Sequence, residues 1–238
     1  MRKLLSKIRR ACDEYHMIEA DETICVAVSG GKDSMAMLAG MKGFSNFSPI
    51  PFKVHALCLD TGFENMDFGK LEEFCREIDV PLTIKKTQIA QIVFDTRKEK
   101  SPCALCAKMR RGALAEAVKE LGASTLALGH HADDLIETFL LSLLYEGRIS
   151  SFKPVTYLDR TGVKTIRPMI NLREQEIIYI VNKNNIPVIK SACPVDGTTK
   201  REDVKNLVKQ LSKQFPESDE RMIHAVKTFL RDMDKNNL

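Results

Sequence analysis

The chain lacks the sequence features of membrane and secreted proteins. No apolar run approaches the roughly 20 residues that a membrane-spanning helix needs. The basic N-terminal segment has neither the apolar core nor the small-residue cleavage site of a secretory signal. Seven cysteines are an odd number, which argues against a framework of disulfides. We therefore expect a cytoplasmic protein that does not bind a membrane.

Aromatic residues are scarce, which limits how the chain can bind nucleic acid. Tryptophan is absent and aromatic residues make up 6% of the chain, so extensive base stacking is not expected. The formal net charge is only +4, but basic residues gather in two segments. These are residues 1–12 (Arg2, Lys3, Lys7, Arg9, Arg10) and residues 97–111 (Arg97, Lys98, Lys100, Lys108, Arg110, Arg111). Such clusters suit a polyanion, and each is also compatible with a solvated helix face.

Helix and strand patterns alternate along the 238 residues, which indicates an α/β fold. We predict a doubly wound, mostly parallel sheet, with a helical C-terminal extension. The predicted strands lie near 23–29, 52–59, 82–87 and 124–129, with a weaker one near 164–167 or 186–190. The predicted helices lie near 2–18, 34–42, 67–78, 104–121, 132–145, 171–184, 199–213 and 217–234. We expect a basic N-terminal segment (1–22), a central domain (23–190) and the C-terminal extension (191–238).

The most informative segment is SGGKDS (29–34), which separates a buried apolar run from a helix-compatible run. A strand, a glycine turn and a helix start direct free backbone N–H groups and the helix dipole at an anion. The two glycines leave room for a phosphate, and Lys32 adds positive charge. Asp33 and Ser34 can cap the helix or hold Mg²⁺. The spacing differs from the P-loop of NTPases, and a plain glycine turn is the alternative.

Two further polar segments follow predicted strands, and we expect them at the same edge of the sheet, where open α/β sheets bind ligands. They are Asp60-Thr61-Gly62 and GHHADD (129–134). The adjacent acids Asp133 and Asp134 oppose the positive end of a helix dipole or hold Mg²⁺ beside a nucleotide. The two histidines are candidates for phosphate or ribose contacts. The alternative is a helix cap with histidines in solvent.

Three cysteines remain once the four in apolar or helical patterns are set aside. Cys103 and Cys106 form a CxxC pair at a helix start, and Cys193 follows much later. The pair alone fits a redox dithiol, half of a zinc site or part of an iron–sulfur site. No second CxxC and no histidine pair at zinc spacing occurs. Three thiolates would hold a [4Fe–4S] cluster with one open iron; zinc and a free dithiol remain alternatives.

Taken in order, these segments resemble the tRNA 2-thiocytidine synthetase family of PP-loop ATP pyrophosphatases. The likeness runs from the basic N-terminal segment through SGGKDSMAML (29–38), CALCAKMRRGAL (103–114) and ELGASTLALGHHADD (120–134). It continues to IRP (166–168) and Cys193. Each motif is moderately specific, but their shared order and spacing are highly specific. The resemblance implies the adenine-nucleotide alpha-hydrolase-like, PP-loop fold for residues 23–190.

The resemblance also implies an activity, an ATP-dependent sulfur transfer to tRNA. ATP would adenylate the C2 oxygen of a pyrimidine, expected to be a cytidine of the anticodon loop. Sulfur on the open iron of a [4Fe–4S] cluster would then displace AMP. The sulfur donor would be hydrosulfide or a cysteine desulfurase persulfide, and a homodimer is expected.

The implied functional residues follow from the matching motifs. ATP would be bound by Ser29, Gly30, Gly31, Lys32, Asp33, Ser34, Asp60, Gly129 and His130. The cluster would be held by Cys103, Cys106 and Cys193, and Mg²⁺ by Asp33, Asp133 and Asp134. Lys32, Asp33, Asp134 and Arg110 would act in catalysis. The tRNA would be bound by Arg2, Lys3, Lys7, Arg9, Arg10, Lys108 and Arg111.

Some segments depart from the family pattern. The stretch SACPV (191–195) differs from the PCxLC form and looks more like the CPxxxxxxR form of related 2-thiouridine enzymes, with Arg201 at the arginine. Those relatives carry terminal zinc-finger cysteines, which this chain lacks before Cys12 and after Cys193. A 2-thiouridine-forming enzyme is therefore an alternative. Two others are a lysidine-synthetase-type ligase that does not use the cysteines, and a nucleotide-responsive iron–sulfur sensor that binds RNA.

Overall fold

The computed structural model describes the whole chain except residues 65, 98–101, 159, 191, 196–198 and 236–238. Lys98 and Lys100 of the second basic segment lie outside the described residues, as does Ser191 beside the third cysteine. Within the described part, no helix is long and apolar enough to cross a membrane.

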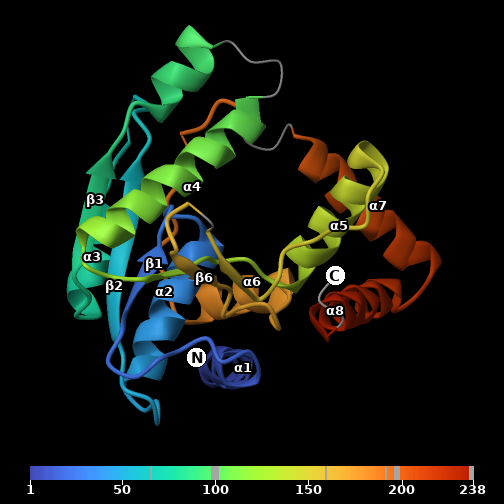
Figure 1. Cartoon of the computed structure of the whole chain (residues 1–238), viewed down its shortest axis with the longest axis horizontal. Helices are drawn as coiled ribbons and strands as arrows, with labels where there is room; N and C mark the ends of the chain where they lie inside the picture. The colour runs from blue at the N-terminus through green and yellow to red at the C-terminus, as the bar shows by residue number, and fades with distance from the viewer. Residues whose placement is uncertain (65, 98–101, 159, 191, 196–198, 236–238) are drawn as a thin grey trace.

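A six-stranded sheet in the order β3-β2-β1-β4-β6-β5 forms the centre of the molecule (Figure 1). Five strands are parallel: β1 (Thr23–Ala27), β2 (Lys53–Asp60), β3 (Leu82–Lys86), β4 (Thr125–Ala127) and β6 (Lys164–Ile166). The edge strand β5 (Val155–Tyr157) runs antiparallel to β6. The mostly parallel α/β sheet is thereby confirmed. The weaker predicted strand is found at 164–166, and 186–190 forms no strand.

The helices are α1 (Arg2–Glu14), α2 (Lys32–Ser45), α3 (Gly69–Glu77), α4 (Pro102–Glu120), α5 (Ala132–Glu146), α6 (Glu174–Lys183), α7 (Lys200–Gln214) and α8 (Ser218–Lys235). All eight were predicted. A short π-helical segment (Gln91–Thr96) and β5 were not. The first helix ends earlier than predicted because His16 takes a left-handed backbone conformation, with φ of 47°.

Helices cover both faces of the sheet, which explains why the central strands β1 and β2 are mostly apolar along their length. Along β1, Ile24 and Val26 pack into a large core with residues of α1, α2, α3, α6 and α8. Cys25, between them, points to the opposite face and packs with α4 and the π-helical segment. The alternation of neighbouring side chains between the two faces thus builds the doubly wound architecture.

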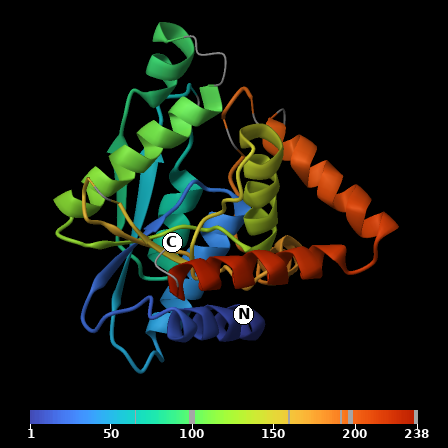
Figure 2. The same ribbon diagram turned by 45° about the vertical axis from the view of Figure 1, so that its right-hand side comes forward.

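The N-terminal and C-terminal segments belong to the same packed body as the sheet. Leu4 and Ile8 of α1 and Val226 and Leu230 of α8 are all buried in the large core. In Figures 1 and 2 the last helix lies close to the first, although they are at opposite ends of the chain. A smaller core joins α5, α7 and α8. The division into residues 1–22, 23–190 and 191–238 stays a prediction.

Candidate functional site

A cavity of about 690 Å³ opens at the carboxyl ends of β1, β2 and β4. This volume lies within the range of small-molecule sites. Several predicted site residues line it: Ser29, Gly30, Gly31, Asp33, Ser34, Cys106, Arg110, Gly129, His130, Asp134 and Cys193. Lys32, Asp60, Cys103 and Asp133 are not among the described residues that line it. The structure therefore brings together the three polar segments and two of the three cysteines.

The glycine loop is closed by its own hydroxyl groups. Ser34 Oγ accepts from the Ser29 backbone N–H at 3.2 Å and donates to the Gly31 carbonyl at 2.9 Å. Gly30 has a φ of +85°, a conformation that L side chains rarely adopt. The loop leads directly into α2, and Gly31, Asp33 and Ser34 at the start of the helix line the cavity, as an anion site at a helix N-terminus requires.

The segment before the third cysteine lies over this loop. The Ile189 backbone N–H donates to the Gly30 carbonyl at 2.9 Å, and a Cβ placed on Gly30 would lie 2.8 Å from Ile189 Cβ. Val188, Ile189 and Cys193 all line the cavity. This part of residues 186–190 therefore packs against the glycine loop, and the segment does not join the sheet.

The end of β4 also approaches the glycine loop closely. A Cβ on Gly129 would meet the backbone of Asp33 and Ser34 at 3.3 Å. His131, which is 3% exposed, caps α5: its backbone N–H donates to Asp134 Oδ2 at 2.9 Å and its Nδ1 accepts from the Asp134 N–H at 3.4 Å. His131 is thus a buried helix cap, in contrast to the solvent-facing histidine of the alternative hypothesis.

His130 has a different environment on the cavity wall. Its ring stacks on Phe152 at 4.9 Å, and Arg167 Nε donates to its Nδ1 at 3.3 Å. Burial, helped by the positive charges of Arg167 and Arg201, lowers the pKa of His130 to about 4. Burial also lowers the pKa of Arg167 to about 10. The imidazole is therefore neutral near pH 7, with its proton on Nε2 because Nδ1 accepts a hydrogen bond.

The two adjacent acids at the start of α5, Asp133 and Asp134, have different partners. Asp133 accepts from Arg173 Nε at 3.0 Å and from the Glu174 backbone N–H at 2.7 Å, so it holds the start of α6. Asp134 lines the cavity, and its Oδ1 accepts from Arg201 at 2.9 Å. The predicted Mg²⁺ role therefore suits the position of Asp134 better than that of Asp133.

Asp33 carries the clearest sign of a missing partner at this site. Its Oδ1 is buried and has no hydrogen-bond partner within the described part of the chain, while His131 Nε2 is 3.8 Å away. Its Oδ2 accepts from Lys32 Nζ at 3.0 Å. Burying a carboxylate oxygen without a partner is costly, and a cation beside Asp33 and Asp134 would satisfy it. The residues present thus fit a hard, oxygen-liganded ion such as Mg²⁺.

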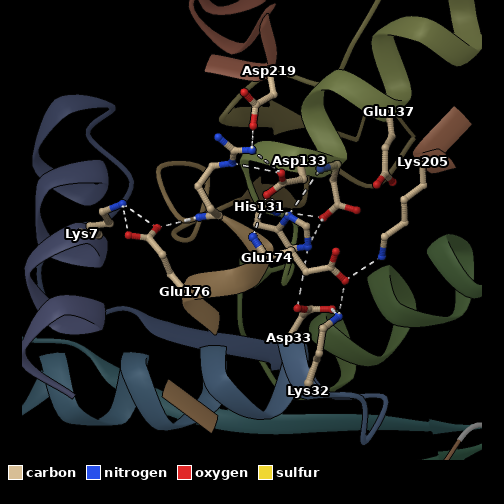
Figure 3. A network of polar contacts seen from close by, with 12 residues as sticks. Lys7, Lys32, Asp33, His131, Asp133, Glu137, Glu174, Glu176, Lys205 and Asp219 are labelled. Atoms are coloured by element: carbon tan, nitrogen blue, oxygen red, sulfur yellow. Dashed lines mark hydrogen bonds and ion pairs between the residues drawn. The ribbon is translucent and has the colours of Figure 1, made fainter. Parts of the chain in front are cut away.

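Lys32 belongs to a network of ion pairs that includes Glu174 and Lys205 (Figure 3). Lys32 Nζ lies 2.9 Å from Glu174 Oε1, and Lys205 Nζ lies 2.8 Å from the same oxygen. Burial alone would raise the pKa of Glu174, but the hydrogen bonds from Lys205 and Lys32 outweigh it and lower the pKa to about 2. Neither Glu174 nor Lys205 was predicted, because an acid at a helix start and a lysine inside a helix are ordinary surface features.

Two of the three cysteines lie on the wall of the cavity. Cys106 and Cys193 line the cavity, while Cys103 is exposed one helical turn from Cys106. Burial raises the pKa of Cys106, the charges of Cys193 and Cys103 add to this rise, and the charge of Arg110 opposes it. No disulfide joins them. Among the described residues, no three His, Cys, Asp or Glu side chains converge closely enough to hold a metal ion.

The predicted tRNA-binding residues fall on two exposed helix faces. Lys3 and Lys7 of α1 both form ion pairs with Glu176, at 2.7 Å, whereas Arg2, Arg9 and Arg10 are exposed. On α4, Lys108, Arg110 and Arg111 are exposed, and Arg110 also reaches the cavity. Their role in binding RNA stays a prediction.

Comparisons with known proteins agree with this geometry. A PP-loop domain family matches residues 3–211. The chain is 31% identical over 228 residues to the tRNA-cytidine(32) 2-sulfurtransferase of Geobacter sulfurreducens, covering 94% of this chain and 89% of that protein. It is 36% identical over 230 residues to the enzyme of the same name from Aliivibrio fischeri, covering 94% of this chain and 75% of that protein.

A solved structure shares the fold. The U34-tRNA thiolase NcsA from Methanococcus maripaludis, solved with its [4Fe–4S] cluster, superposes with a TM-score of 0.80 at 21% identity. The match covers 97% of this chain and 78% of that chain. At this identity the likeness shows the fold alone.

Proposed function

The chain belongs to the PP-loop domain family and to the tRNA-cytidine(32) 2-sulfurtransferases within it, and from this premise we propose that it is an ATP-dependent tRNA sulfurtransferase. One observation carries the proposal most directly: a single cavity is lined both by the SGGKDS loop and by Cys106 and Cys193. A ligase that ignores its cysteines has no need of this arrangement. Because the relatives named above act on cytidine 32, we propose that nucleoside as the target, with a 2-thiouridine product as the alternative.

The part of the cavity beside the glycine loop, its phosphate end, suits the first half-reaction, in which ATP adenylates the pyrimidine. Backbone N–H groups of the glycine loop and the start of α2 would hold the ATP phosphates, and Mg²⁺ would be held by Asp33 and Asp134. The C2 oxygen of the pyrimidine attacks the α-phosphorus, and pyrophosphate leaves. Lys32 and Arg110 would stabilise the negative charge that develops. His130, being neutral, can donate a hydrogen bond through Nε2 without adding charge.

The cavity wall that carries Cys106 and Cys193, the cysteine wall, suits the second half-reaction, in which sulfur replaces the activated oxygen. Cys106 and Cys193 line the cavity, Cys103 precedes Cys106 by one turn of α4, and none of the three is in a disulfide, so these are the thiols that would ligate a [4Fe–4S] cluster. Such a cluster would supply an open iron position for the incoming sulfur. In the exchange itself, the bond from C2 to oxygen breaks, a bond from C2 to sulfur forms, and AMP leaves with the original oxygen. The proton of hydrosulfide passes to solvent.

The substrate must reach the cavity from outside. A base stacked in an RNA loop has to leave its neighbours before its C2 oxygen can react. The exposed basic residues of α1 and α4 are the proposed contacts to tRNA phosphates, which position the RNA without reading its sequence. The sulfur donor and the homodimer stay predictions.

Metal analysis of protein purified without oxygen tests this proposal. About four irons and four acid-labile sulfides per chain are expected, as one [4Fe–4S] cluster requires. Substitution of Cys193 by Ala should lower the iron content while ATP binding survives. Zinc in place of iron, or no metal in either protein, would contradict the proposal and favour the ligase hypothesis.

A further inference from the structure

Lys32 is held away from the cavity that the glycine loop serves. Its Nζ contacts Asp33 Oδ2 at 3.0 Å and Glu174 Oε1 at 2.9 Å, and it is not among the described residues lining the cavity. Figure 3 shows the side chain directed at Glu174 of α6. In this conformation the ammonium group of Lys32 is paired with the carboxylates of Asp33 and Glu174.

The second partner of Glu174 makes this contact exchangeable. Lys205 on α7 binds the same Oε1 at 2.8 Å, so Glu174 keeps a cation when Lys32 leaves. The backbone of Glu174 is held in place, because its N–H donates to Asp133 Oδ2 at 2.7 Å. Arg173 anchors that region further through ion pairs with Asp133 and Asp219. A carboxylate that contacts two lysines can thus release one of them without being left unpaired.

From this arrangement we infer that Glu174 is a positioning residue that holds Lys32 in a withdrawn state, and that ATP phosphates bind by taking Lys32 from Glu174 while Lys205 remains. The inference rests on the proposed function, since it needs Lys32 to contact phosphate. It adds a regulatory device that opposes binding until a triphosphate competes for the lysine. Lys205 lies on α7, the helix that follows Cys193, and its contact with Glu174 determines how strongly Glu174 binds Lys32.

Equilibrium binding of ATP with Mg²⁺, measured by calorimetry on the full chain without tRNA, tests the inference. The variants are Glu174→Gln, Lys32→Met and the double substitution. Glu174→Gln should tighten ATP binding about threefold to fivefold, the scale of one part-exposed ion pair. In the Lys32→Met background the same substitution should have no effect. Glu176→Gln is the matched control, because Glu176 lies on the same helix and pairs instead with Lys3 and Lys7.

Each outcome separates the hypotheses. Weaker or unchanged ATP binding in Glu174→Gln would overturn the inference. Tighter ATP binding that persists when Glu174→Gln is combined with Lys32→Met would also overturn it, since that result indicates only a general effect of removing negative charge. If Lys32→Met alone leaves ATP binding unchanged, the proposed role of Lys32 fails, and the inference with it. If Lys32→Met weakens binding while Glu174→Gln does not tighten it, only the inference fails. Unfolding temperatures would identify a variant that binds poorly because it is destabilised.

Discussion

The two ends of the cavity are built in opposite ways. The phosphate end comes from one contiguous hexapeptide, whose Ser34 hydroxyl closes its own loop. The other end, the cavity wall that carries Cys106 and Cys193, combines α4 with a segment that follows α6. In that segment the Ile189 backbone N–H donates a hydrogen bond to the Gly30 carbonyl of the glycine loop. A local motif therefore specifies the first site, whereas the second depends on how distant parts of the chain pack.

Removing Cys193 is expected to have the largest effect and to separate the two ends. Cys193→Ala should abolish thiolation of tRNA while Mg-ATP binds with unchanged affinity, because the alanine leaves the glycine loop intact. Nucleoside mass spectrometry and calorimetry measure the two properties. Cys75→Ala, a buried cysteine on α3 outside the cavity, is the control and should retain thiolation. Full thiolation by the Cys193 variant would show that the cysteine wall is not needed.

Substitution of Gly30 should disturb both the glycine loop and the segment before Cys193, because the two are in close contact at this residue. Gly30→Ala places a Cβ 2.8 Å from Ile189 Cβ at a φ of +85°, so either the loop or the strap of residues 188–190 must move. We expect loss of ATP binding and a decrease of about 1–2 kcal/mol in the free energy of unfolding. Gly112→Ala, where an added Cβ meets no atom within 4 Å, should be harmless. Normal ATP binding by Gly30→Ala would contradict the close packing of strap and loop.

The acids near the phosphate end allow a finer test. Asp33→Asn should weaken Mg-dependent ATP binding about tenfold or more, since it removes the charge from a buried oxygen that lacks a partner. Asp133→Asn should instead lower the free energy of unfolding by about 1–3 kcal/mol, because that carboxylate holds Arg173 and the start of α6. Urea unfolding and calorimetry distinguish them. The reverse pattern would mean that Asp133 is the ion ligand.

The smallest expected effect is on acid stability. Burial opposes the ionisation of Glu176, but hydrogen bonds from Lys3 and Lys7 lower its pKa to about 2. A carboxylate whose pKa is depressed on folding stabilises the protein above its unfolded pKa and loses this contribution as the pH falls toward 2. Glu176→Gln should therefore destabilise the protein by about 1 kcal/mol at pH 6, after allowing for the exposure of Lys3. The difference should shrink at pH 3; a constant difference would exclude this linkage.

Features that depend on a local sequence pattern could be predicted from the sequence, whereas features that depend on the packing of distant segments could not. The parallel strands, the helices and the glycine turn before α2 were predictable, because each has a local sequence pattern, whereas the edge strand β5 and the π-helical segment were not predicted. The withdrawn position of Lys32 was not, since it depends on Glu174 and Lys205, which carry no distinctive pattern. The different roles of Asp133 and Asp134 also escaped prediction: neighbouring helical residues point in different directions, and only the packing of α6 and α7 decides their partners.

One measurement tests the central claim, that a single cavity joins ATP chemistry to sulfur transfer. Unmodified tRNA would be incubated anaerobically with the purified protein, Mg-ATP and sulfide, and its nucleosides analysed by mass spectrometry. The account predicts replacement of one oxygen by sulfur in a cytidine, only when ATP is present, with release of AMP and pyrophosphate. Consumption of ATP with no sulfur in the tRNA, by protein that carries its cluster, would contradict it.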